Sequence, residues 1–208
     1  MEPYITVSGY GRDEIVEKRS KFIASVYPVS RESEATEIIN RLKKEYWDAR
    51  HNVYAYSLRE NNICRYSDDG EPSGTAGVPV LDVIKKRGIT DCLIVVTRYF
   101  GGVLLGTGGL VRAYTASALK GIEKAGVVRM EPCSKLSVCC EYSDYDALTR
   151  LITLSGGNII DSRYAENIEI DFSLDSSLLD NFSEKLKETF CARIELKITG
   201  ECYCGKAE

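Results

Sequence analysis

The sequence predicts an α+β protein of two domains, and three observations lead to this. The chain has 208 residues, which suits one large domain or two small ones with a sizeable core. Strand-like and helix-like patterns alternate along it. A helical pattern ends at Gly126 and Pro132 cannot continue it, so the boundary falls within residues 127–135. We therefore expect an N-terminal domain over residues 1–129 and a C-terminal domain over residues 133–208.

The N-terminal half begins with strand-like stretches and ends with a helix. The expected elements are strands within 4–10 and 14–30, a helix carrying Ala35, Ile38, Ile39, Leu42 and Tyr46, a hairpin of 51–58 and 62–68, a helix over 80–88, a strand over 91–100, and a helix carrying Leu110, Val111, Tyr114, Ala118 and Ile122. The apolar run at 91–100 is typical of a buried central strand. We expect the helices to cover one face of a sheet.

The C-terminal half predicts a ferredoxin-like unit. The expected elements are a strand over 134–143, a helix carrying Leu148, Leu151 and Ile152, two strands within 158–174, a helix carrying Leu179, Phe182, Leu186 and Phe190, and a strand over 191–204. Capping-box patterns at Ser143 with Asp146, and at Ser177 with Asp180, precede the two helices. The order β-α-β-β-α-β is that of the ferredoxin-like fold, in which two helices cover one face of an antiparallel sheet.

The two halves differ in charge. Residues 1–130 hold 19 Lys and Arg against 16 Asp and Glu, and residues 131–208 hold 8 against 15. The net charges of +3 and −7 indicate different partners for the two halves. Neither charge by itself identifies a nucleic-acid binder, because such domains are usually far more basic.

Cysteine usage and the N-terminus predict a cytoplasmic protein. No stretch has the apolar length of a signal peptide or a transmembrane helix. The eight cysteines are therefore expected to be reduced thiols. No CxxC pair occurs and His51 is the single histidine, so we predict no metal site and no cofactor.

A glycine-rich segment, YFGGVLLGTGGLVRAY at residues 99–114, joins the apolar strand to the following helix. It fits neither the P-loop nor the dinucleotide pattern, which argues against ATP or NAD binding by either standard mechanism. Thr107 is expected to cap a helix whose first turn holds Gly108 and Gly109, leaving backbone N–H groups that attract an anion, with Arg98 and Arg112 nearby. Close packing of strand and helix explains the glycines equally well, so both interpretations stay open.

A second loop, SDDGEPSGTAGVP at residues 67–79, concentrates carboxylates. Asp68, Asp69 and Glu71, near Ser73 and Thr75, are a candidate set for chelating Mg²⁺ beside a phosphate, because Mg²⁺ prefers oxygen ligands. Ordinary turn chemistry also accounts for them, and the lack of a matching Lys favours the turn.

Four segments together resemble the YigZ/IMPACT family: SKFIA at 20–24, HNVYAY at 51–56, and the two loops at 67–79 and 98–114. The resemblance implies an N-terminal β-α-β fold like elongation factor G domain IV and a ribosomal-protein domain, and a C-terminal domain like elongation factor G domain V. It also implies a link to translation, since eukaryotic relatives restrain a translation kinase by competing for its activator. This chain has Val53 where the family often has Cys, so a thiol there is not required for a shared chemistry.

These observations lead to one expected function and two alternatives. We expect a non-catalytic, translation-associated protein that binds RNA or the ribosome, or a translation-related protein, with no membrane partner and no DNA specificity. The alternatives are an enzyme for a phosphorylated small molecule, with Asp69 and Glu71 as ligands or base, and a protein–protein adaptor. The residues expected to bind an anion or RNA are Lys21, Arg98, Gly101, Gly102, Gly106, Thr107, Gly108, Gly109 and Arg112. The family-motif residues are His51, Asp68, Asp69, Glu71, Ser73, Gly74 and Thr75.

Overall fold

A computed structural model describes residues 1–207. By its internal contacts the chain divides into two compact units. Residues Tyr4–Arg129 form the N-terminal unit, and Met1–Pro3 with Met130–Lys206 form the C-terminal unit. Among the described residues, no helix is both long enough and apolar enough to cross a membrane.

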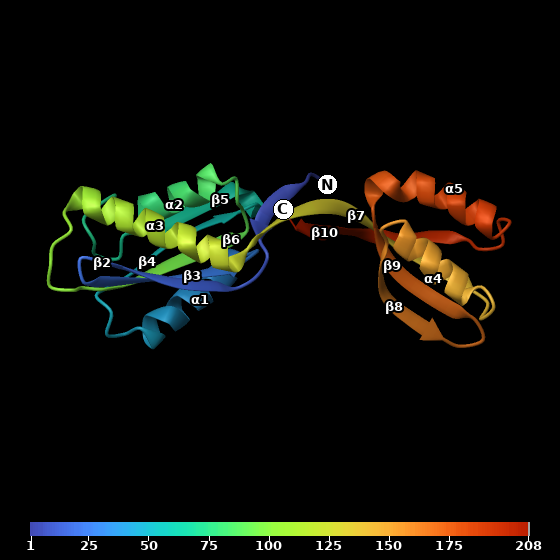
Figure 1. Ribbon diagram of the computed structural model, residues 1–208, viewed down its shortest axis with the longest axis horizontal. Coiled ribbons are helices and arrows are strands. Elements are labelled where there is room, and N and C mark those ends of the chain that lie inside the picture. Colours follow the sequence, from blue (N-terminus) through green and yellow to red (C-terminus); the bar gives the residue numbers. More distant parts are fainter. Residues whose placement is uncertain (208) are drawn as a thin grey trace. The chain divides into compact units, whose positions relative to one another are not determined.

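The N-terminal unit is built on a five-stranded antiparallel sheet with the strand order β2-β3-β6-β4-β5 (Figure 1). Its elements are β1 (Tyr4–Val7), β2 (Gly11–Glu17), β3 (Ser20–Pro28), α1 (Glu32–Glu45), β4 (His51–Leu58), a 3-10 turn (Glu60–Asn62), β5 (Ile63–Ser67), α2 (Gly77–Lys86), β6 (Cys92–Tyr99) and α3 (Thr107–Ala125). The predicted hairpin at 51–68 and the predicted buried central strand at 91–100 are both present, as β4–β5 and β6.

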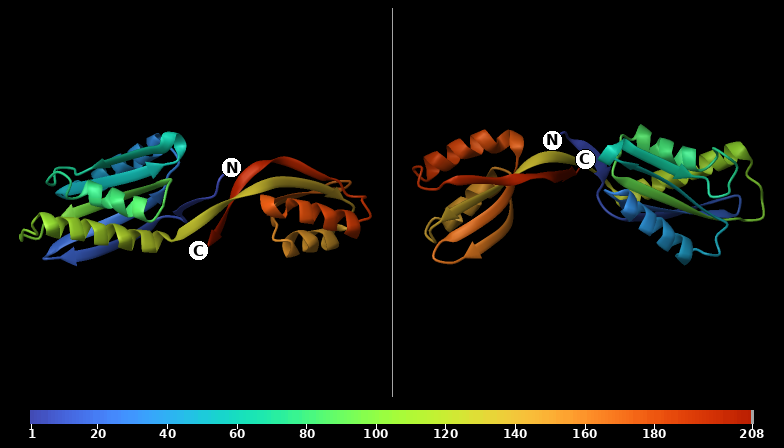
Figure 2. Two further views of the ribbon diagram at one scale, coloured as in Figure 1. Left: turned by 90° about the horizontal axis from the view of Figure 1, so that it is seen from above. Right: turned by 180° about the vertical axis from the view of Figure 1, so that it is seen from behind.

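Helices cover both faces of this sheet, so the expectation that they lie on one face was wrong. Figures 1 and 2 show α2 and α3 on one side of the sheet and α1 on the other. Along β6, Ile94 and Val96 are buried against α2 and α3, whereas Leu93 and Val95 are buried against α1. A central strand that is apolar on both sides needs a cover on both, because strand side chains alternate between the faces.

The C-terminal unit has the predicted β-α-β-β-α-β order. Its elements are β7 (Val127–Cys140), α4 (Tyr145–Leu154), β8 (Asn158–Tyr164), β9 (Ile168–Asp175), a 3-10 turn (Ser176–Leu178), α5 (Leu179–Thr189) and β10 (Leu196–Ala207). β7 pairs with β9 and with β10, and β9 pairs with β8. Both helices lie on one face of the sheet (Figure 2), where Leu148, Phe172 and Phe182 are fully buried.

Two local expectations about this half are corrected. The strand expected over 134–143 is longer: β7 starts at Val127 and continues through Pro132 to Cys140. Neither predicted serine caps a helix: the residue before α4 is Asp144, and α5 follows a 3-10 turn in which Asp175 accepts a hydrogen bond from the Ser177 N–H at 3.0 Å. In the second case Asp175, two residues before the expected cap, caps the 3-10 turn, and no side chain caps α5 itself.

Candidate functional site

Three neighbouring strands bring the candidate side chains into one row. In the antiparallel register, Arg98 of β6 lies opposite His51 of β4 on one side and opposite Phe22 of β3 on the other. Val96 and Val53 are buried and lie two residues from Arg98 and His51 along the same strands. Both belong to the core beneath α2 and α3. By the two-residue period, the row therefore faces those two helices.

Glu71, from the loop before α2, is the centre of the site. Its Oε1 atom accepts hydrogen bonds from Arg98 Nη1 at 2.6 Å and from the Tyr114 hydroxyl of α3 at 2.8 Å. Glu71 is 7% exposed, Arg98 5% and Tyr114 0%. Burial, together with the charge of Glu71, raises the pKa of Tyr114, so the hydroxyl stays protonated and donates. The ion pair thus ties the loop, the central strand and α3 together.

Arg98 is held in place by more than Glu71. Its Nη2 atom donates to Ser20 Oγ at 3.4 Å, and Ser20 Oγ also accepts from the Gly101 N–H at 3.2 Å. The guanidinium carbon lies 5.3 Å from the ring centroid of Phe22 and 5.6 Å from that of Phe100, distances at which cation–π attraction acts. Arg98 is therefore buried and paired, because a buried charge requires a counter-charge, which Glu71 supplies. Arg98 also lines the pocket described below, and its expected contact with a phosphate stays a prediction.

His51 has one ring nitrogen fixed and one directed toward Glu71. Its Nδ1 atom lies 2.8 Å from the Asp69 carbonyl oxygen, which only accepts, so Nδ1 carries the proton. The other ring nitrogen, Nε2, lies 3.8 Å from Glu71 Oε1. His51 thus places one ring nitrogen beside the Glu71 carboxylate.

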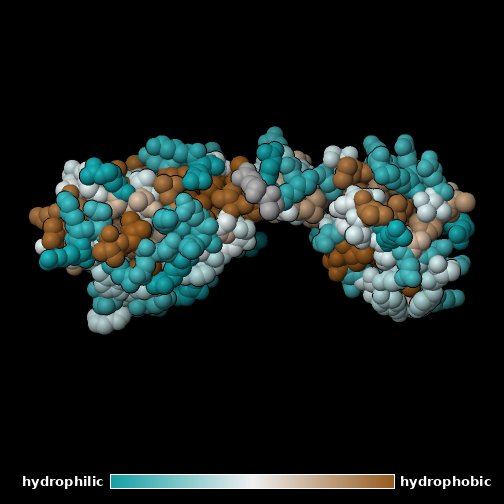
Figure 3. All heavy atoms as spheres, in the orientation of Figure 1, coloured by the Kyte–Doolittle hydropathy of each residue, from teal (hydrophilic) through white to brown (hydrophobic). Residues whose placement is uncertain are grey.

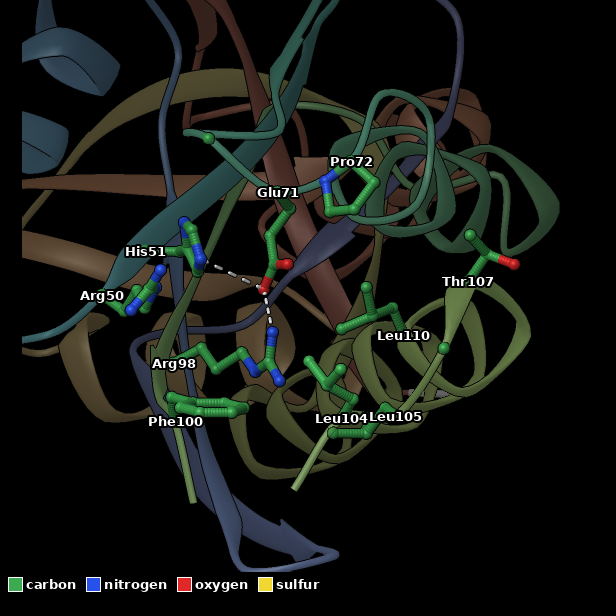
Figure 4. A pocket seen from close by; sticks show the side chains of 12 residues that line it. Arg50, His51, Glu71, Pro72, Arg98, Phe100, Leu104, Leu105, Thr107 and Leu110 are labelled. Atoms are coloured by element: carbon green, nitrogen blue, oxygen red, sulfur yellow. Dashed lines mark hydrogen bonds and ion pairs between the residues drawn. The ribbon is translucent and has the colours of Figure 1, made fainter. Parts of the chain in front are cut away.

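These residues line a pocket of about 470 Å³ at the start of α3, within the range of small-ligand sites (Figure 4). Its lining residues are Arg50, His51, Gly70, Glu71, Pro72, Arg98, Phe100, Leu104, Leu105, Gly106, Thr107 and Leu110. Polar groups lie on the side of β4 and β6, and leucines lie on the side of α3. Because Arg98 balances Glu71, the exposed Arg50 leaves the lining with a net positive charge.

The carboxylates of the loop at 67–79 do not converge on one point. Asp68 accepts from the backbone N–H groups of Gly74, Ala76 and Gly77 at 2.8–3.0 Å, which closes the loop and holds the start of α2. Asp69 accepts from the Asn52 N–H and from Lys43 Nζ, each at 2.6 Å.

The rest of the loop follows turn chemistry. Thr75 Oγ1 donates to the Pro72 carbonyl at 2.6 Å, and Ser73 is exposed. Among residues 1–207, no group of three or more His, Cys, Asp and Glu side chains is arranged to hold a metal ion. The turn interpretation therefore describes Asp68 and Asp69, while Glu71 alone reaches the pocket.

The two interpretations of the glycine segment concern different residues: some glycines allow close packing, and others lie at the exposed start of α3. Gly101 packs on the backbone of Arg19, where an added Cβ would overlap the Arg19 carbonyl carbon. The residue that precedes α3 is Gly106, with φ 72°, and not Thr107 as expected; a β-branched residue is strained at that φ. Gly102, Thr107 and Gly108 are exposed.

Two more expected positions have their own neighbours. Gly109 packs on Leu105. Lys21 pairs with Glu14 at 2.8 Å, whereas Arg112 is exposed and lines a shallow hollow with Lys18.

The sequence patterns missed Arg50 and the leucines as pocket residues, and treated Tyr114 as core only. The register offered a signal for part of this. If the strands expected at 51–58 and 91–100 pair end to end in antiparallel fashion, His51 and Arg98 lie opposite each other and on the same face. The loop residues carry no such period.

Comparisons with known proteins agree with this architecture. Residues 18–122 match the Impact N-terminal domain, and residues 138–193 match a domain of unknown function, DUF1949. The chain is 39% identical over 208 residues to IMPACT family member YvyE of Bacillus subtilis, covering 100% of this chain and 96% of that protein. It is 32% identical over 174 residues to IMPACT family member YigZ of Escherichia coli, covering 82% and 85%. A crystal structure of a hypothetical protein has a TM-score of 0.61 at 29% identity and covers 95% of this chain and 98% of its own. Since both domain models match and a relative aligns along the whole chain, the protein belongs to the IMPACT family.

Proposed function

We propose that the N-terminal unit binds RNA in a translation-associated role, through the surface around residues 100–109. The observation that carries this proposal is a set of four exposed cations that border the segment: Lys18, Arg19, Arg50 and Arg112. None of the four forms a salt bridge with a carboxylate in the described part of the chain. Exposed cations that no carboxylate pairs with are available to neutralise phosphates.

The glycine segment is next to each of these cations. Lys18 and Arg112 line the shallow hollow together with Leu105 and Gly109, and Arg50 lines the larger pocket with Leu105. The Arg19 backbone lies against Gly101.

Apolar side chains share this surface. Phe100 is 42% exposed and Leu104 82% exposed, and Figure 3 shows hydrophobic residues beside hydrophilic ones at the end of the N-terminal unit where α3 begins. A surface that combines cations with exposed apolar groups suits single-stranded RNA, whose bases are available for contact. The resemblance to translation factors makes ribosomal RNA the first target to test.

The test is fluorescence anisotropy of a labelled single-stranded RNA over a series of salt concentrations. Affinity should fall with salt, with a log–log slope of about −0.7 for each phosphate that is neutralised. The double variant Arg50→Ala/Arg112→Ala should bind more weakly and show a slope shallower by about 1–2. The matched control is Lys120→Ala/Lys124→Ala, which removes two charges from the other end of the same helix. Equal losses in both double variants, or binding that ignores salt, would refute the proposal.

The two alternatives have less support. An enzyme that uses Asp69 with Glu71 needs both carboxylates at one place, yet Asp69 is engaged by Lys43 and Asn52 and does not line the pocket. A protein–protein adaptor predicts a specific protein that co-purifies after nuclease treatment. Such a protein, found together with no RNA affinity, would replace the proposal.

A further inference from the structure

We infer that the pocket at the start of α3 receives a nucleobase that bears an exocyclic amino group, with the phosphate of that nucleotide near Arg50. This inference rests on the proposed RNA binding for its choice of ligand class. The polarity, charge and shape of the pocket carry the argument.

A hydrogen-bond acceptor of Glu71 faces the cavity. Glu71 Oε1 is used by Arg98 and Tyr114, whereas Oε2 accepts no hydrogen bond from any residue between 1 and 207. In Figure 4 this second oxygen points away from Arg98 and His51, toward the side where Leu110 and Thr107 lie. His51 Nδ1 donates to the Asp69 carbonyl, so Nε2 is the ring nitrogen directed toward Glu71 and the pocket. A ligand that fits must donate hydrogen bonds.

The charge of the pocket selects a neutral donor over a cationic one. Arg98 lies 2.6 Å from Glu71 and already balances its charge, so an ammonium group finds no net negative charge to pair with. Arg50 at the rim adds a positive charge, and its guanidinium lies 5.9 Å from the Phe100 ring centroid. An amino group on a neutral ring that is joined to an anionic group matches both features.

The remaining walls are apolar. Pro72, Leu104, Leu105 and Leu110 face the polar groups across about 470 Å³. An apolar wall opposite a placed acceptor suits a heteroaromatic ring whose edge carries the donors. Adenine, cytosine and guanine have such an edge, and carboxylates accept from the cytosine amino group in other complexes. Uracil has no exocyclic amino group and places carbonyl oxygens on both sides of its single N3–H donor, so it should bind more weakly.

Nucleoside monophosphates test this directly on the full chain. Titration calorimetry with AMP, CMP, GMP and UMP should give saturable binding of the amino-bearing nucleotides, about tenfold or more tighter than UMP. In protein made without a histidine tag, His51 is the only imidazole, so its Nε2 resonance in a ¹⁵N spectrum should move on binding. Equal affinity for all four nucleotides, or an unmoved Nε2 resonance at saturation, would overturn the inference.

Two variants probe the walls and the acceptor. Leu104→Ala, at a side chain 82% exposed, should keep the fold and weaken AMP binding several-fold. Val103→Ala is the matched control, because it shortens an exposed neighbour on the same loop that does not line the pocket. Glu71→Gln keeps an oxygen for Arg98 and turns the free acceptor into a donor, so a folded Gln variant should prefer UMP. If Glu71→Gln does not fold, AMP binding by Leu104→Ala still tests the inference.

Oligonucleotides separate this inference from the proposed function. Salt-dependent RNA binding with no uptake of any mononucleotide, and with oligo(A) and oligo(U) bound equally, overturns the pocket inference and leaves the RNA proposal intact. Saturable AMP binding that Leu104→Ala weakens, without RNA binding, supports a free nucleotide as ligand and removes the RNA proposal. Preference for oligo(A) over oligo(U) that Leu104→Ala abolishes supports a base within an RNA strand.

Discussion

Replacing Arg98 by methionine should destabilise the N-terminal unit by about 3–5 kcal/mol, because it leaves the Glu71 carboxylate buried without its counter-charge. The Arg98 and Glu71 side chains are 6% and 3% exposed and their charged atoms are 2.6 Å apart, so water replaces little of the lost interaction. Methionine keeps much of the aliphatic bulk, which limits the cavity contribution. An exposed pair of similar length, Lys21 with Glu14 at 2.8 Å and 41% and 46% exposed, should lose at most about 1 kcal/mol in Lys21→Met.

The assay is urea unfolding followed by far-UV circular dichroism, with the two units fitted as separate transitions. The double variant Arg98→Met/Glu71→Leu should cost less than Arg98→Met alone, since no charge is left buried. It still leaves the buried Tyr114 hydroxyl without its acceptor, at about 1–3 kcal/mol. Equal effects of Arg98→Met and Lys21→Met, or a double variant less stable than Arg98→Met, would refute this account of the site.

Three further predictions concern other buried or capped groups. A hydrogen bond from Lys206, with further bonds from Ser177, lowers the pKa of Asp175 to about 2, below the unfolded value of about 3.9. Its stabilisation is complete above about pH 4 and is lost as pH falls toward 2, so Asp175→Asn should flatten the dependence of Tm on pH in that window. Asp68→Ala should cost about 2–3 kcal/mol in urea unfolding, because three backbone N–H groups lose a charged acceptor. Burial raises the pKa of Cys92 to about 12, so iodoacetamide at neutral pH should label it only after unfolding, as mass spectrometry of the peptides will show.

Each of these has a matched comparison in the same chain. Asp180→Asn changes an exposed carboxylate near Asp175. It should leave the fall of Tm with decreasing pH the same as in the unmodified protein. Asp82→Ala, on the exposed face of α2, should cost well under 1 kcal/mol, and a loss equal to that of Asp68→Ala would contradict the capping role. The exposed Cys139 should be alkylated in the folded protein under conditions that spare Cys92.

Local patterns were sufficient for most of the secondary structure. The β-α-β-β-α-β order of the C-terminal unit follows from helical and alternating periods of residues such as Leu148, Ile152, Phe182 and Leu186, all buried as the patterns require. The capping signals were less reliable, since serine, aspartate and a 3-10 turn compete for the same backbone groups within two residues. An error of one or two residues at the start of a helix leaves the order of the elements unchanged.

The sequence by itself therefore determined the class, the order of elements and the family, because these depend on periods and motifs within short windows. Tertiary structure alone decided that α1 covers the second face of the sheet, and that Glu71 turns inward while Asp68 and Asp69 turn to the loop and to Asn52. It also decided that Arg98 is a buried partner of Glu71, 27 positions away. The physical reason is that a charge in the core takes whichever counter-charge the fold brings within hydrogen-bond distance, and no local period encodes that distance.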